Sequence, residues 1–130
     1  MEDKDRQSLI NYRIQQAKET IELAEFLKNS GKLAVAVNRI YYGLYYSLTA
    51  LALKNKFETS KHLQLIGWFN SEFITTNKIN KRSGKTLRNA YQNRRKGDYD
   101  AFVDFTLDEV ETMLQDMKDF VNEIENYIKE

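Results

Sequence analysis

The sequence predicts an all-α fold, a four- to five-helix up-and-down bundle built from a single domain of residues 1–130. The chain has 130 residues with no proline and only five glycines, which is typical of long helices joined by short connections. Hydrophobic residues make up 42% and charged residues 30% of the chain, so it can bury a core and keep a hydrated surface. In addition, apolar residues recur at spacings of four and three along most of the sequence.

The first helix is expected from about Asp5 to Asn29. Ser30 and Gly31 should end this helix and start the central one, because glycine after a periodic run ends a helix and serine can cap the next one. Since this connection is short, the first two helices should be antiparallel neighbours. The apolar face of the first helix consists of Ile10, Ile14, Ala17, Ile21, Ala24 and Leu27.

The central helix lies in a helical pattern that runs from about Lys32 to Phe57, and it is expected to end near Lys54-Asn55-Lys56, with Gly43 in its middle. A glycine there costs about 1 kcal/mol of helix propensity relative to alanine, and it allows another backbone or a ligand to approach closely. The apolar face, which should point to a core, consists of Leu33, Val37, Tyr41, Leu44, Leu48 and Leu51, and the neighbouring face carries Asn38, Tyr42, Tyr45 and Thr49.

The tyrosines of this helix have two interpretations. They can be amphipathic core or interface residues, which bury the ring and keep the hydroxyl wet. Alternatively, together with Asn38 and Arg39, they line a polar, aromatic site on the central helix, to which Tyr42 and Tyr46 contribute.

A third helix is expected from about Lys61 to Ile74, with Thr59 or Ser60 as its cap. The basic stretch Lys78–Gly84 should form a loop, and a short fourth helix should cover Lys85–Arg95.

The last helix is expected from about Ala101 to Ile128, after a break at Lys96–Asp98 and a cap at Asp98 or Asp100. Its heptad-like pattern suits left-handed bundle packing, so this helix should form the body of the bundle with the first and central helices. The pattern consists of Val103, Leu107, Val110, Leu114, Met117, Val121, Ile124 and Ile128, widened by Phe102, Met113, Phe120 and Tyr127.

Charge is segregated along the chain, although the formal net charge is only +1. Residues 98–130 are strongly acidic, whereas residues 78–96 contain basic residues and no acidic one. Such segregation can serve an anionic partner, or it can serve the fold, with the basic segment lying along the acidic helix or along a second subunit. The basic residues are Lys78, Lys81, Arg82, Lys85, Arg88, Arg94, Arg95 and Lys96.

Several classes of function are excluded or disfavoured. The chain has no cysteine and a single histidine, His62, so disulfides, thiolate metal sites and cysteine nucleophiles are excluded. The sequence has no Glu-x-x-His pair, P-loop or Gly-x-Gly-x-x-Gly motif, and we expect no metal and no cofactor. There is no apolar run of about 18 residues and no signal-peptide pattern, so we expect a soluble cytoplasmic protein without a membrane partner.

Two short stretches could carry chemistry. His62, in Ser60-Lys61-His62, is either a structural or capping residue or an acid–base group that titrates near neutrality. In Arg94-Arg95-Lys96-Gly97-Asp98-Tyr99, two arginines, an aspartate and a tyrosine would suit a phosphate or a base. Alternatively, an Arg–Asp pair closes the turn before the last helix.

Three blocks in this order resemble the HEPN domains of prokaryotes, specifically the small stand-alone group. The blocks are AVNRIYYGLYY at residues 36–46, SKHLQLIGWF at residues 60–69 with Phe73 after it, and RRKGDY at residues 94–99. The resemblance implies a helical bundle that commonly forms a homodimer. It also implies association with nucleotides or RNA, and often with a minimal nucleotidyltransferase encoded beside it, as in toxin–antitoxin pairs.

Many HEPN proteins are metal-independent RNases whose signature is an arginine and a histidine four to six residues apart. This chain lacks that signature, because positions 55 to 57 before His62 are Asn, Lys and Phe. The catalytic roles of the family therefore cannot be carried over to this chain, and His62 is left as the one weak catalytic candidate. The expected ligand-binding residues, shared between the central helix, the start of the third helix and the turn before the last helix, are Asn38, Arg39, Tyr42, Tyr46, Lys61, His62, Arg94, Arg95, Asp98 and Tyr99.

Three hypotheses follow. The first is a non-catalytic HEPN-like module that binds a nucleotide or RNA and works with a nucleotidyltransferase partner. The second is a protein whose only task is interaction, through dimerisation or docking of a partner. The third is an RNase in which His62 acts as the base and Arg94 or Arg39 holds phosphate.

Overall fold

The computed structural model describes residues 1–100 and 103–130, and within these residues the fold contains helices and no strand. This confirms the predicted all-α class. The elements are α1 (Asp3–Asn29), α2 (Leu33–Lys54), α3 (His62–Phe69), the π-helical turn η1 (Asn70–Ile74), α4 (Lys81–Tyr99) and α5 (Leu107–Lys129).

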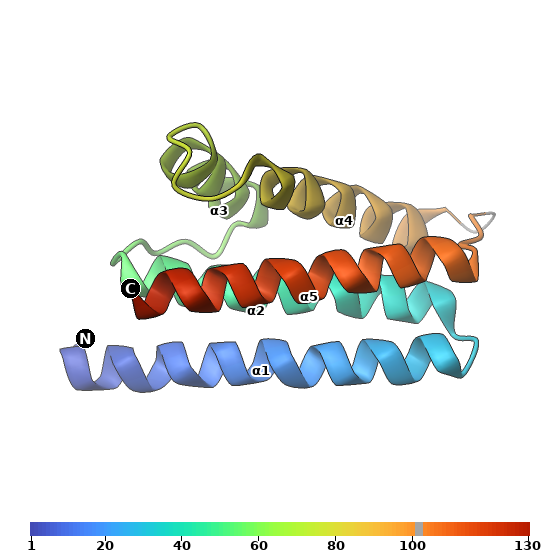
Figure 1. Ribbon diagram of the computed structural model, residues 1–130, viewed down its shortest axis with the longest axis horizontal. Coiled ribbons are helices and arrows are strands. Elements are labelled where there is room, and N and C mark those ends of the chain that lie inside the picture. Colours follow the sequence, from blue (N-terminus) through green and yellow to red (C-terminus); the bar gives the residue numbers. More distant parts are fainter. Residues whose placement is uncertain (101–102) are drawn as a thin grey trace.

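The four long helices α1, α2, α4 and α5 run alternately up and down along one axis, and both chain termini lie at the same end (Figure 1). The short α3 and η1 lie across this direction, between the end of α2 and the start of α4 (Figure 1). Helix α2 contacts each of the other four α-helices. Different faces of α2 therefore meet side chains from different elements.

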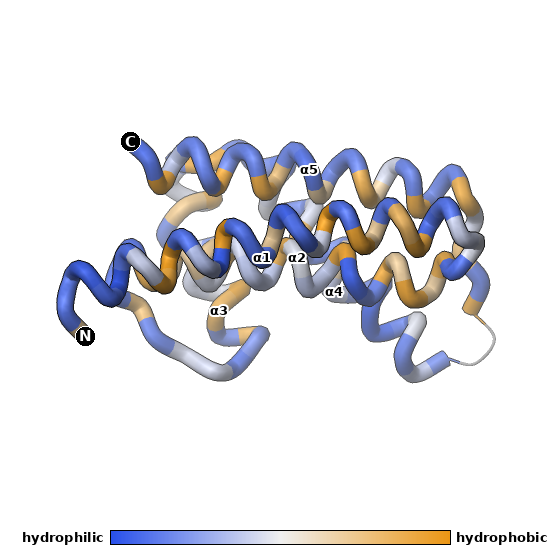
Figure 2. The backbone as a smooth tube through the Cα atoms, turned by 90° about the horizontal axis from the view of Figure 1, so that it is seen from below, coloured by the Kyte–Doolittle hydropathy of each residue, from blue (hydrophilic) through white to orange (hydrophobic). Residues whose placement is uncertain are grey.

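Most residues of the predicted apolar faces form the core, although Leu107, predicted to belong to the face of α5, is 49% exposed. Hydrophobic residues recur along the three helices α1, α2 and α5 (Figure 2), because burial of one helical face imposes this period. From α2, Val37, Tyr41, Leu44, Leu48 and Leu51 are all buried. The faces of α1 and α5 contribute Ile10, Ile14, Ala17, Ala24, Val110, Leu114, Met117, Val121, Ile124 and Ile128.

Gly43 lies where α1, α2 and α5 meet. A Cβ atom at this position would overlap the terminal methyl group of Met117 on α5 and lie 3.3 Å from Cγ2 of Thr20 on α1. The close approach expected at Gly43 is thus made by side chains of two neighbouring helices.

The connection between α1 and α2 is as short as predicted, but the residue that caps α2 differs from the prediction. Ser30 closes the end of α1, Gly31 has a positive φ of 77°, and Lys32 stands at the N-cap of α2 without a side-chain hydrogen bond. Similarly, Lys61 is the N-cap of α3, whereas Thr59 Oγ1 accepts a hydrogen bond of 3.1 Å from the Lys61 amide. The predictions of Ser30, and of Thr59 or Ser60, as N-cap residues were wrong.

Helix α4 is longer than predicted at both ends. It begins at Lys81, inside the stretch expected to be a loop, because the Asn80 side chain caps it by accepting a hydrogen bond of 2.8 Å from the Arg82 amide. It continues to Tyr99, through the break expected at Lys96–Asp98. Gly97 stays helical, and a Cβ there would lie 3.4 Å from the Phe105 ring.

Helix α5 begins at Leu107, so the predicted start at Ala101 was wrong; residues 101 and 102 themselves lie outside the described part of the chain. Neither Asp98 nor Asp100 caps it. The cap is Thr106, whose Oγ1 accepts a hydrogen bond of 3.1 Å from the Glu109 amide, while the Glu109 carboxylate accepts one of 3.0 Å from the Thr106 amide. This reciprocal capping box ends the preceding loop.

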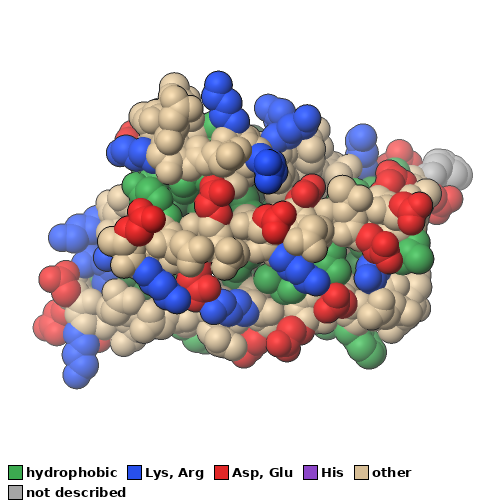
Figure 3. Space-filling view, in the orientation of Figure 1, with side chains coloured by type: hydrophobic (Ala, Val, Ile, Leu, Met, Phe, Trp, Pro, Cys, Tyr) green, Lys and Arg blue, Asp and Glu red, His purple; other side chains and the backbone are tan. Residues whose placement is uncertain are grey.

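The acidic helix α5 forms its ion pairs with α1 and within itself. Salt bridges join Lys18 to Glu125 at 2.7 Å, Lys28 to Glu111 at 3.7 Å and Lys118 to Glu25 at 3.2 Å. Lysine and arginine side chains line the edge over α3 and α4, and acidic side chains lie over α5 (Figure 3). Among the described residues, no helix combines the length and apolar composition needed to cross a membrane.

Candidate functional site

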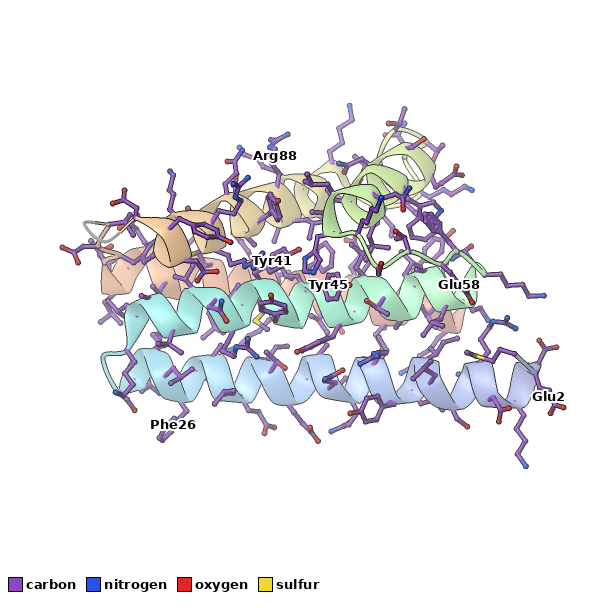
Figure 4. All side chains as sticks on the ribbon, turned by 180° about the vertical axis from the view of Figure 1, so that it is seen from behind. Glu2, Phe26, Tyr41, Tyr45, Glu58 and Arg88 are labelled. Carbon is purple, nitrogen blue, oxygen red and sulfur yellow. The ribbon has the colours of Figure 1, made fainter. Side chains whose placement is uncertain are left out.

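A cluster of aromatic rings joins α2, α3 and α4. Tyr41, Tyr42 and Tyr45 come from α2, His62 is the first residue of α3, and Tyr91 comes from α4. The His62 ring stacks on Tyr45 with centroids 4.3 Å apart and an interplanar angle of 12°. The Tyr41 ring lies 5.7 Å from both His62 and Tyr91. Tyr41 and Tyr45 both face the gap between α2 and the upper helices (Figure 4).

Tyr41 and His62 are joined by a hydrogen bond of 2.6 Å between the phenol oxygen and Nδ1. Burial raises the pKa of Tyr41 well above its ordinary value, and the nearby Arg94 only partly opposes this. Burial, followed by the charge of Arg94, lowers the pKa of His62. At neutral pH both groups are therefore uncharged. Because a phenol both donates and accepts, either neutral tautomer of His62 can make this bond.

A chain of polar side chains links the start of α2 to the end of α4. Arg39 donates to Asn38 Oδ1 from Nε at 3.1 Å and from Nη2 at 2.8 Å. Asn38 Nδ2 donates to Asp98 Oδ1 at 3.5 Å, and Asp98 Oδ2 accepts from Arg94 Nε at 3.1 Å. The Arg–Asp pair proposed from the sequence therefore exists, but inside one helix and with a partner on α2.

Both guanidinium groups at the ends of this chain lie near aromatic rings. Arg39 is 4.8 Å from the centroid of Tyr42, and Arg94 is 5.3 Å from Tyr42 and 5.4 Å from Tyr41. Cations within about 6 Å of a tyrosine ring are attracted by its quadrupole. The aromatic cluster and the polar chain thus form one site, with two cations held in place.

The structure brings together most of the residues expected to form the site: Asn38, Arg39, Tyr42, His62, Arg94 and Asp98. Tyr46 lies at its edge, with its ring 6.3 Å from both Tyr42 and Tyr45. Lys61 is exposed and contributes only its backbone to a hydrogen bond. Arg95 lies 6.0 Å from the Tyr91 ring and 5.9 Å from that of Tyr99, which is 77% exposed. Lys61 and Tyr99 are therefore outside the cluster, and Arg95 contacts it only at its outer side, through Tyr91.

Tyr41, Tyr45 and Tyr91 belong to the cluster, although the sequence did not place them among the ligand-binding residues. Tyr41 was assigned to the core, and it is indeed fully buried, but its hydroxyl serves the site. Tyr91 precedes Arg94 by three residues on the same helix, and this spacing puts the two side chains on one face.

The outer face of α4 carries exposed cations along its length. Lys81, Lys85, Arg88 and Arg95 recur with Gln92 at spacings of four and three, and all five are exposed. We call this row the α4 basic face; Lys96 lies beside it. No acidic residue in the described part of the chain forms a salt bridge with any of these cations, although α4 and α5 are in contact. The α4 basic face is thus not neutralised by the acidic helix, whereas Arg82, which is not part of this face, lies close enough to Asp116 of α5 for its charge to oppose the rise that burial causes in the pKa of that carboxyl.

The chemistry of the site suits anions. Guanidinium groups bind phosphate and carboxylate through paired N–H donors. Within the described residues, no three histidine, aspartate or glutamate side chains gather where they could hold a metal ion. The arrangement therefore offers two arginines, several aromatic faces and one neutral imidazole.

The fold and the site define the protein as an all-α bundle that has an aromatic, arginine-bearing site between α2 and α4. Comparison with known proteins shows the family to which it belongs. The family model for the HEPN domain matches residues 10–127. The chain therefore belongs to the HEPN domain family.

Similar proteins come from a bacterium and an archaeon. The chain is 34% identical to a protein of Thermotoga maritima named "UPF0332 protein", over 97% of this chain and 96% of that protein. It is 33% identical to "Putative toxin MJ0142" of Methanocaldococcus jannaschii, over 88% and 78% of the two chains. A second protein of that archaeon, "Putative toxin MJ0605", is 29% identical over 98% and 95%.

Proposed function

We propose that this protein is a HEPN module that binds RNA or a nucleotide through phosphate, without catalysing its cleavage, as part of a toxin–antitoxin-like system. The observation that carries the proposal is the α4 basic face, a row of exposed and unpaired cations beside an aromatic site. Phosphates bind to such cations, and bases stack on tyrosine and arginine. The names of two similar proteins, which describe them as toxins, support the wider role.

The test is a titration of labelled single-stranded RNA and of ATP at low and moderate salt. For single strands, the logarithm of the affinity falls against the logarithm of the salt concentration with a slope of about −0.7 per phosphate contact. The double variant Lys85→Ala/Arg88→Ala should therefore bind more weakly, and its slope should be about 1.4 units shallower if each cation contacts one phosphate.

The control is Lys4→Ala/Lys54→Ala, which removes the same charge from exposed lysines of α1 and α2 that form no salt bridge. It should bind nearly as the wild type does. Equal losses of affinity in the two double variants would show that only the net charge of the protein matters. Absence of binding at low salt would refute the proposal.

The role in a toxin–antitoxin-like system, with a minimal nucleotidyltransferase as partner, has its own test. Expression of the protein alone should arrest growth, and co-expression of a nucleotidyltransferase encoded beside it should restore growth and allow the two to be purified together. Unimpaired growth together with no co-purification would contradict this part of the proposal.

One observation favours a second candidate, a metal-independent RNase. Arg94 and His62 come from different helices but both contact Tyr41, and no described residue forms a hydrogen bond with His62 Nε2. A neutral imidazole with a free nitrogen can act as a general base. Cleavage of RNA that is lost in His62→Gln would establish this activity, whereas cleavage that persists in the variant would exclude the mechanism.

A further inference from the structure

A groove of about 540 Å³ lies between α3 and α4, outside the aromatic cluster. Its walls are Leu63 and Ile66 from α3 and Tyr91 from α4, and its rim carries Arg88, Arg95 and Lys96. This volume is within the range of sites that bind small organic molecules. The groove therefore combines an apolar floor with cations and has no acidic residue in its lining.

The apolar wall is open to solvent. Leu63, the second residue of α3, is 65% exposed, and Ile66, one turn further on, is only partly buried. Tyr91 closes the inner side: its ring contacts Tyr41 of the cluster at 5.7 Å, and the Arg95 guanidinium lies 6.0 Å from the same ring. A flat ring placed here would be covered by aliphatic carbon and would meet a tyrosine and an arginine, as bases do in single-strand binding sites.

Polar groups at the edge of the groove are free to bind. The side-chain amides of Asn70 and Gln92 line it and form no hydrogen bond with any described residue. An amide offers both donors and an acceptor, which match the edges of nucleobases. Arg88, Arg95 and Lys96 likewise have no acidic partner within the described chain.

Charge distinguishes this groove from the one on the opposite side of α4. That second groove, of about 300 Å³ between α2, α4 and α5, is lined by Glu109 and Asp116. Carboxylates there would repel a phosphate. The two sides of a single helix thus differ in the ligand they can accept, and only the α3–α4 side suits an anion that also carries an apolar ring.

We propose that the α3–α4 groove binds one nucleobase of a single-stranded RNA, with the base against Leu63, Ile66 and Tyr91 and its flanking phosphates on Arg88, Arg95 and Lys96. This inference rests on the proposed RNA binding and deepens it, because it names a subsite that distinguishes a strand with a base from one without. The α4 basic face alone would bind any polyanion.

The experiment compares the binding of a labelled uridine hexanucleotide with that of an abasic strand carrying the same number of phosphates. The wild type should prefer the base-containing strand by about tenfold, since stacking of one base contributes roughly that much. Leu63→Ser should abolish this preference without changing the salt dependence. Because Leu63 is 65% exposed, the variant should fold, which circular dichroism would verify.

The matched control is Leu23→Ser, which changes a leucine of α1 that is 44% exposed. It should keep the wild-type preference, while Arg88→Ala should weaken the binding of both strands alike. A wild type that binds both strands equally, or a Leu63→Ser variant with an unchanged preference, would overturn the subsite and leave the proposed RNA binding standing. A wild type that binds neither strand would overturn both.

Light scattering of the same samples separates one further outcome. If Leu63→Ser changes the molar mass of the protein in solution without altering its preference for bases, the groove is an interface between two copies of this chain, and the subsite is refuted.

Discussion

The Tyr41 hydroxyl and the His62 Nδ1 atom lie 2.6 Å apart and join the middle of α2 to the first residue of α3. Tyr41 is fully buried, whereas His62 is only partly covered and stacks on Tyr45. A buried phenol needs a hydrogen-bond partner. The histidine thus completes the core of the bundle and, at the same time, holds α3 beside the candidate site.

Replacing Tyr41 by phenylalanine should therefore destabilise the protein although the ring is kept. We expect the free energy of unfolding to fall by about 1 kcal/mol, the usual net contribution of one hydrogen bond. Urea denaturation would measure it. The control is Tyr12→Phe, since Tyr12 is 58% exposed and its hydroxyl forms no hydrogen bond with a described residue; equal stability of Tyr41→Phe and wild type would show that the bond contributes nothing.

The lowered pKa of His62 predicts a specific dependence of stability on pH. Because burial and Arg94 lower the pKa in the folded state, the unfolded chain takes up the proton more readily, starting near its ordinary value of 6.5. The contribution of His62 to the free energy of unfolding should thus be fully present above pH 6.5. It should decline as the pH falls through this value towards the pKa of the folded state. Carboxylates with lowered pKa values, such as Glu109 and Glu125, change the stability only in more acidic solution, below the range in which His62 titrates.

Thermal unfolding of wild type and His62→Gln between pH 7.5 and 5.5 would measure this contribution. The melting temperature of the wild type should fall more steeply in this range than that of the variant, because glutamine does not titrate. Parallel curves for the two proteins would show that His62 does not titrate differently in the folded and unfolded states.

Arg94 should control the titration of His62 directly. Its positive charge is one of the two causes that lower the pKa of the histidine, so Arg94→Ala should move this pKa up towards the ordinary value. The chain has a single histidine, and its ring proton resonance can be followed by NMR without ambiguity. Arg88→Ala removes an exposed arginine of the same helix and should leave the pKa unchanged; a shift of similar size in both variants would contradict a specific role of Arg94.

The bundle was predictable from the sequence because burial of one face imposes a period on each long helix. Helix ends were less predictable, since they depend on single contacts. Gly97 was interpreted as a break, yet it continues α4 and packs beside Phe105. The cap at Thr106 could have been found, because Thr106 and Glu109 have the spacing of a capping box.

The candidate site was predictable in part. Asn38 and Arg39 stood out as polar residues in the periodic pattern of the central helix, and Arg94 and Asp98 stood out in the charged run before the last helix. The structure joins these four residues in one connected chain. The hydrogen bond that Tyr41 contributes to the site could not be predicted from the sequence. Its position on the apolar face correctly indicated burial, but its hydrogen bond depends on His62, 21 residues later in the chain, which only the tertiary arrangement brings near.

Gly43 and Gly67 provide a test of how tightly the three core helices pack. A side chain at Gly43 would meet Met117 and Thr20, whereas a Cβ at Gly67 of α3 would have no atom within 4 Å. We expect Gly43→Leu to lower the free energy of unfolding by about 3 kcal/mol, because extra carbon atoms in a filled core force its neighbours apart. Gly67→Ala should raise it by up to about 1 kcal/mol through helix propensity. Urea denaturation of both variants would measure the difference, and a Gly43→Leu protein as stable as the wild type would mean that the contact between α1, α2 and α5 has room to spare.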